Sequence, residues 1–122
     1  MIGYITLGTN KMAEAARFYD ALMAEFGAKR VMQSDTFIAW SASSGTPALS
    51  ITKPHDGQPA SVGNGVMVAL VVDTTEKVDA IHAKALALGG SDEGAPGARG
   101  PNFYAGYFRD LDGNKLNVFK MG

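Results

Sequence analysis

The chain has 122 residues, a formal net charge of −1 and 46% apolar residues, the composition of an ordinary globular protein that can bury a core. A chain with this charge balance has no excess of basic residues for binding nucleic acid or an anionic membrane surface. No apolar run is long enough to span a bilayer. The absence of cysteine excludes disulfides, thiolate metal ligands and a cysteine nucleophile. Because the N-terminus lacks a secretory pattern, we expect a cytoplasmic protein.

The first half of the chain is predicted to form a strand, a helix and three further strands. Residues 2–8 are a short apolar run, and residues 11–26 carry apolar side chains at helical spacing. We expect Thr9 or Asn10 to cap this helix by accepting a hydrogen bond from a free backbone N–H, and Gly27 to end it in the left-handed conformation. Turn-forming residues then separate three predicted strands, at 28–33, 36–42 and 47–53.

The second half repeats this order after a linker. Residues 54–64 contain two Pro and two Gly without any periodicity, which is typical of a linker. Residues 65–72 form the next apolar strand, and Asp73 or Thr74 is the expected cap of a helix over about 75–88.

The end of the chain combines a Gly-rich stretch with a hairpin pattern. Gly89-Gly90 ends the second helix, and residues 91–102 are predicted as a long loop with, at most, a short edge strand at its start. Residues 104–120, YAGYFRDLDGNKLNVFK, are predicted as two strands joined by a tight turn. In that turn, Gly113 or Asn114 supplies the positive φ, and an Asp side chain bonds the local N–H groups.

The two halves match each other at fixed offsets. At an offset of 67 positions, aromatic and aliphatic strand residues coincide: Phe37 with Tyr104, Trp40 with Tyr107, Leu49 with Leu116, and Ile51 with Val118. At an offset of 63, the openings coincide: Tyr4 with Met67, Phe18 with Ile81, and Gly27 with Gly90. The chain therefore contains one supersecondary unit twice, and we expect equivalent positions of the two copies to form the site.

This repeated βαβββ order resembles the vicinal oxygen chelate superfamily, which includes glyoxalase I, extradiol dioxygenases, and bleomycin and fosfomycin resistance proteins. Phe18-Tyr19 with Gly27 are similar to its FY…L…G signature, and YFRDLDGNKLNVF over 107–119 is similar to its FxDPDGNxxE hairpin. The resemblance covers nearly the whole chain. It implies an α+β fold in which two tandem βαβββ modules form curled mixed sheets around a cleft. We expect a single domain over 1–122, with modules at about 1–53 and 65–122.

The resemblance also implies four metal-ligand positions, on the first and last strands of each module. In this chain they hold Tyr4, Ser50, Met67 and Asn117. A divalent metal needs imidazole, carboxylate or thiolate donors, and a phenol, a hydroxyl, a thioether and an amide do not supply them. We therefore expect no metal and no other cofactor, and we expect these four residues to line an amphipathic cleft.

Other side chains have two interpretations each. Trp40 and Tyr107 lie mid-strand, where they line the cleft or pack in the core. Arg99 is a candidate clamp for a carboxylate or phosphate, or belongs to an ordinary surface loop. His55 in the linker is expected to be exposed. His82 in the second helix is a candidate general base, or a partly exposed helix residue without a chemical role.

Two main classes of function remain open. The first is a metal-free protein that binds a small organic molecule, as the bleomycin-resistance branch does. The second is a metal-independent or divergent lyase or isomerase, with Tyr4 as acid or electrophile and Arg99 or Asn117 holding an anionic substrate. A degenerate interaction subunit is a third. We expect a homodimer, because the aromatic strands and sheet edges leave surfaces for a partner to cover.

Overall fold

The structure, a computed structural model, describes residues 1–122 and divides into two compact units, Met1–Val62 and Gly63–Gly122. Each unit consists of one strand, one helix and three further strands. The fold is therefore α+β with two tandem βαβββ modules, which confirms the expected fold class. Neither helix is long and apolar enough to cross a membrane.

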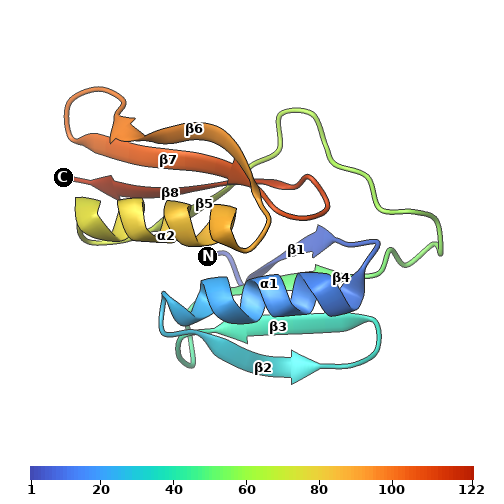
Figure 1. Ribbon diagram of the computed structural model, residues 1–122. Helices are drawn as coiled ribbons and strands as arrows, with labels where there is room; N and C mark the ends of the chain where they lie inside the picture. The colour runs from blue at the N-terminus through green and yellow to red at the C-terminus, as the bar shows by residue number, and fades with distance from the viewer. The chain divides into compact units, whose positions relative to one another are not determined.

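Unit 1 is a four-stranded sheet with one helix along it (Figure 1). Its elements are β1 (Tyr4–Gly8), α1 (Met12–Ala24), β2 (Lys29–Gln33), β3 (Phe37–Ser41) and β4 (Ala48–Thr52). The strand order is β1-β4-β3-β2, with β1 parallel to β4 and the other neighbours antiparallel. This mixed order follows from the crossover through α1, which leads from β1 to β2 at the opposite edge, so that β4 returns to lie parallel to β1.

The core of unit 1 lies between α1 and one face of this sheet. The buried side of α1 comprises Ala15, Ala16, Phe18, Tyr19, Leu22 and Met23. Trp40 pairs with Leu49 and Ile38 pairs with Ile51, so all four side chains share the face toward α1. Each large apolar side chain buried here contributes about 1.5–3 kcal/mol to stability. Residues one position away, such as Ser50, face the opposite side of the sheet.

The beginning of α1 differs from the prediction. The N-cap residue is Lys11, and no side chain caps the helix. Thr9 accepts instead from the backbone N–H of Lys11, and the Asn10 amide exchanges two hydrogen bonds with the backbone of Ala60, fifty residues later. The predicted cap by Thr9 or Asn10 is thus wrong, because both side chains bond backbone outside the helix. Gly27 does end the helix region with a φ of 70°, as predicted.

Unit 2 repeats the arrangement with β5 (Val68–Val71), α2 (Thr75–Ala87), β6 (Ser91–Ala98), β7 (Phe103–Arg109) and β8 (Lys115–Met121) (Figure 1). The strand order is β5-β8-β7-β6, with β5 parallel to β8. Thr74 caps α2 by accepting from the backbone N–H of Lys77 at 3.1 Å, which confirms one of the two predicted caps. Phe108, Leu116 and Val118 are fully buried.

The stretch predicted as a long loop is mostly a strand. β6 pairs with β7 from Ser91 opposite Arg109 to Ala98 opposite Tyr104, with two register shifts between Asp92 and Gly97. The Gly and Pro residues of this segment predicted a loop. They are tolerated in β6 because bulges interrupt its hydrogen-bond ladder with β7.

The hairpin between β7 and β8 closes as predicted. Gly113 has a φ of 91°, and the buried carboxylate of Asp110 accepts from the backbone N–H groups of Asp112 and Asn114, both at 2.9 Å. Asp110 also accepts from the side-chain amide of Asn114. These bonds fix the turn locally, which is the role expected for an Asp side chain in it.

Candidate functional site

The sheet face of unit 2 opposite α2, called here the Tyr107 face, carries several side chains that can contact a ligand. The pairing of β7 with β8 decides its members, because Tyr107 lies opposite Asn117, Arg109 opposite Lys115, and Ala105 opposite Phe119. Tyr104 and Phe108 point to the other face, where the Tyr104 hydroxyl donates to Asp79 of α2. The Tyr107 face thus carries aromatic, cationic and amide groups side by side.

Two cations lie at the Tyr107 ring. The guanidinium carbon of Arg99 is 5.5 Å from the ring centroid, and the ammonium nitrogen of Lys115 is 5.7 Å from it. Neither cation forms an ion pair with a carboxylate. The third cation on this face, Arg109, is matched by Glu93 at 2.9 Å and also donates to the carbonyl oxygen of Gly113. The face therefore retains two uncompensated positive charges.

Asn117 is a buried amide with an unmet acceptor. It is only 2% exposed, and its Oδ1 has no hydrogen-bond partner. Leaving a buried acceptor unpaired costs about 1–3 kcal/mol. Such a group in a native fold calls for a donor from outside the chain, either a water molecule or a ligand. Farther along the face, the Phe103 and Phe119 rings are stacked with centroids 5.4 Å apart.

The remaining predicted site residue of unit 2, Met67, precedes β5 and is 40% exposed. Unit 2 therefore brings Tyr107, Asn117 and Arg99 together on one face. Met67 lies one residue before β5, and the residue of β5 that pairs with Asn117 is Ala69.

The predicted site residues of unit 1 lie in three different settings. Tyr4 is 65% exposed, and its ring forms a T-shaped pair with the Phe37 ring. Ser50 is fully buried, and its hydroxyl donates to the carbonyl oxygen of Ile5 at 2.7 Å. Trp40 is buried toward α1, so its position matches the core alternative that the sequence left open.

His82 is buried, which corrects the expectation that it is partly exposed. It is 5% exposed, and its Nε2 lies 3.1 Å from both Asp92 Oδ1 and the carbonyl oxygen of Tyr107. Since both neighbours are acceptors, Nε2 carries the hydrogen and donates to them. The pKa of Asp92 is lowered, first by the hydrogen bond from the backbone N–H of Gly94 and also by His82. The signal in the sequence was its equivalence with Tyr19, which is itself buried.

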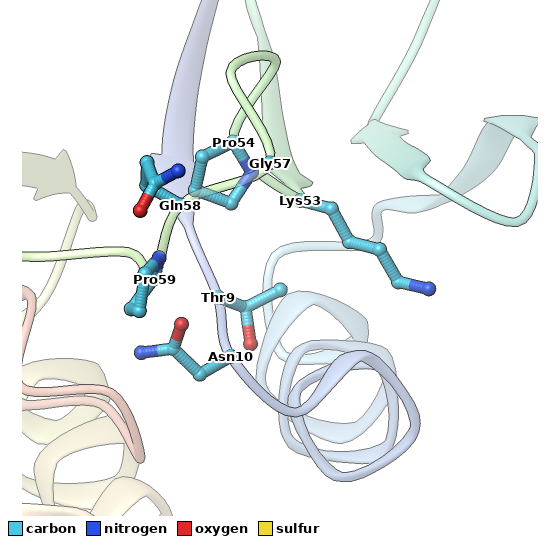
Figure 2. Close-up of a pocket in the computed structure, with 7 residues that line it drawn as sticks. All are labelled: Thr9, Asn10, Lys53, Pro54, Gly57, Gln58 and Pro59. Carbon is cyan, nitrogen blue, oxygen red and sulfur yellow. The ribbon is translucent and has the colours of Figure 1, made fainter.

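Unit 1 contains a separate pocket that sequence reasoning missed (Figure 2). Its volume is about 330 Å³. Its lining residues come from the segment after β1, from the residue after β4 and from the linker: Thr9, Asn10, Lys53, Pro54, Gly57, Gln58 and Pro59. The Asn10 amide already bonds Ala60 through both of its polar atoms, and the Thr9 hydroxyl accepts from Lys11. The pocket therefore has one charged group, Lys53, and no cluster of free polar side chains. The exposed His55 lies in the same linker, as expected.

A tandem pair of βαβββ modules, each with a helix on one face of a mixed sheet, defines the class of protein. A family model for the Glyoxalase/Bleomycin resistance protein/Dioxygenase superfamily matches residues 1–118. The chain belongs to this superfamily, as the sequence resemblance suggested.

Solved structures agree with this assignment. The chain is similar to a glyoxalase/bleomycin resistance protein from Albidiferax ferrireducens, with 33% identity, a TM-score of 0.89, and coverage of 98% of this chain and 97% of that one. The fold is shared with a lactoylglutathione lyase from Agrobacterium tumefaciens (22% identity, TM-score 0.69, 98% and 92% covered). It is also shared with a fosfomycin resistance protein from Mesorhizobium loti (16% identity, TM-score 0.71, 100% and 92% covered). No curated protein matches the sequence significantly.

The metal chemistry of this superfamily does not fit the residues present. No group of three or more His, Cys, Asp or Glu side chains is placed to hold a metal ion. Of the four residues at the expected ligand positions, Ser50 already uses its hydroxyl within unit 1, and Asn117 offers a neutral amide. A divalent metal would gain no anionic or imidazole donor from these side chains.

Proposed function

We propose that this chain binds a small organic molecule on the Tyr107 face without the help of a metal. The observation that carries the proposal is the buried, unpartnered Oδ1 of Asn117 directly opposite Tyr107 in the β7–β8 ladder. An aromatic surface with a few oriented polar groups is the usual composition of a small-molecule site. Membership of a superfamily that includes resistance proteins supports the same interpretation.

The test is a ligand screen with matched tyrosine variants. Thermal-shift and saturation-transfer NMR measurements on the full chain would use a set of small aromatic compounds. Tyr107→Ala should weaken binding of the hits by about tenfold, because it removes the stacking surface. Tyr104→Ala is the control, since Tyr104 is on the same strand but faces α2. Equal effects of the two variants, or no hits at all, would reject the proposal.

A homodimer is the assembly that we expect. Support comes from β2, whose five residues are all exposed although they include Val31 and Met32. Apolar side chains on an edge strand are suited to being covered by a second copy. Light scattering at micromolar concentration should give twice the monomer mass, and Met32→Lys should shift the mass toward the monomer. A monomer for the unmodified chain would remove this expectation.

A further inference from the structure

Arg99 directly follows β6 and is held in position by backbone groups of β6 and β7. Its backbone N–H donates to the carbonyl oxygen of Phe103 at 2.8 Å, and its Nη2 donates to the carbonyl oxygen of Ala95 at 2.6 Å. The side chain therefore folds back along β6 toward the Tyr107 ring instead of extending into solvent. One backbone acceptor leaves most of the five guanidinium donors available.

Two glycines provide the space for this guanidinium. A Cβ at Gly97 would lie 3.0 Å from Arg99 Nη1, and a Cβ at Gly94 would lie 3.4 Å from Arg99 Nη2 and 3.2 Å from the Tyr107 ring. Gly94 and Gly97 also pair with Tyr107 and Ala105, so both lie on the Tyr107 face. Gly94 and Gly97 thus leave room for the Arg99 guanidinium, because a side chain at either position would approach it closely.

The charge at this position is not neutralised within the chain. Arg99 and Lys115 both approach one aromatic ring, and Glu93, the carboxylate on this face, is engaged by Arg109. A cation–π contact at an exposed site contributes about 0.5–1 kcal/mol, and it leaves the charge itself in place. An anionic group that reaches both cations would gain from each of them.

We infer that the small molecule bound at the Tyr107 face carries an anionic group, held jointly by Arg99 and Lys115, next to an aromatic or planar body. This inference rests on the proposed function and adds the chemical class of the ligand. The planar body lies against Tyr107, with the stacked Phe103 and Phe119 rings one step along the same face. The anion is a carboxylate or a phosphate monoester, since guanidinium and ammonium groups bind both.

The experiment compares three probes that share one ring system. Isothermal titration of the full chain would use 2-naphthoate, 2-naphthyl phosphate and the neutral 2-naphthylmethanol. At least one anion should bind about tenfold more tightly than the alcohol, and the two anions distinguish a carboxylate site from a phosphate site. In the double variant Arg99→Gln/Lys115→Gln, this advantage should disappear while the affinity for the alcohol stays within about twofold.

Matched controls separate a local site from general attraction. Arg17→Gln/Lys84→Gln removes the same charge from the two helices and should keep the anion advantage. Gly97→Ala should reduce the advantage about fivefold by displacing the guanidinium, whereas Gly3→Ala, where a Cβ would meet nothing within 4 Å, should not.

Each failure has its own meaning. Equal affinity for the alcohol and the anions, both lost in Tyr107→Ala, would overturn the anion inference and leave the proposed function intact. An anion advantage lost equally in the helix control would also overturn the inference. Binding of no probe, or binding insensitive to Tyr107→Ala, would overturn both the inference and the proposed function.

Discussion

The indole N–H of Trp40 donates to Asp20 Oδ1 at 2.9 Å, which connects the middle of β3 to α1. The same carboxylate accepts two hydrogen bonds from Arg30 of β2, at 2.9 and 2.7 Å. One helix residue therefore joins two strands of unit 1. Because the indole is buried, its N–H needs this acceptor, and Asp20 meets that need at the rim of the core.

Asp20→Asn should lower the free energy of unfolding at neutral pH by about 1 kcal/mol, because it removes a partly exposed ion pair. The asparagine oxygen can still accept from Trp40, so the loss reports on Arg30. The pKa of Asp20 is lowered, first by the hydrogen bond from Arg30 and then by that from Trp40. A lowered carboxyl pKa contributes stability above the unfolded-state pKa, and this stability is lost as the pH falls through the folded-state pKa.

Urea unfolding at pH 7 and at about pH 3 would measure this effect. The difference between the original chain and Asp20→Asn should shrink at the acidic pH. Asp35→Asn, in the exposed turn before β3, is the control and should have little effect at either pH. A constant difference across this range would show that the ion pair is not its cause.

His82→Phe should lower the free energy of unfolding by about 2 kcal/mol. Phenylalanine keeps an aromatic ring at this position, but the carbonyl oxygen of Tyr107 loses the hydrogen bond that His82 Nε2 donates at 3.1 Å. Asp92→Ala is the comparison, because it leaves that bond in place and alters a half-exposed carboxylate, so its effect should be smaller. If the two variants are equally destabilised, the bond to Tyr107 is not the important one.

Thr74→Ala should destabilise the protein by about 1 kcal/mol, because its hydroxyl accepts from the backbone N–H of Lys77 at the start of α2. Lys11→Ala, at the equivalent position of α1, should be nearly neutral, since the Lys11 side chain makes no capping bond. Thermal or urea unfolding would measure both. A large loss for Lys11→Ala would contradict this difference between the two helices.

Metal removal should leave the protein unchanged. After dialysis, elemental analysis should find far less than one equivalent of zinc, nickel or manganese, because the chain offers no set of anionic or imidazole donors. EDTA should alter neither the melting temperature nor the binding of 2-naphthoate. Stoichiometric metal in the purified protein, with stability lost on chelation, would show that a donor set has been overlooked.

The internal repeat makes much of the fold predictable. The offsets of 63 and 67 residues align both helices and most strands from the sequence alone, and Thr74 and Gly27 mark helix boundaries through local chemistry. Local signals of this kind depend on nearby residues, so the sequence contains them directly. The cap at Asn10 was mispredicted because its real partner, Ala60, is fifty positions away.

The candidate site is less predictable. The sequence points to Tyr107, Asn117 and Arg99, yet it does not reveal that Arg99 reaches Tyr107 across Gly94 and Gly97, because the composition of β6 predicts a loop. The pairing of β6 with β7 is irregular, with two register shifts, and Gly-rich strands have weak intrinsic preference, so the sequence does not predict this register. Lys115 was missed for a different reason: the hairpin is predictable, but the register that places Lys115 opposite Arg109, on the same face as Tyr107, is seen only in the structure.

The irregular ladder of β6 also has a consequence for solubility. β6 is the last strand of its sheet, and its outer side would be a template for an extended segment from another molecule. The two register shifts break the regular spacing of its backbone groups, and Pro96 has no N–H to offer. An incoming strand would therefore find no continuous row of partners. The irregular β6 strand that leaves room for Arg99 therefore also makes this sheet edge a poor template for fibrous aggregation.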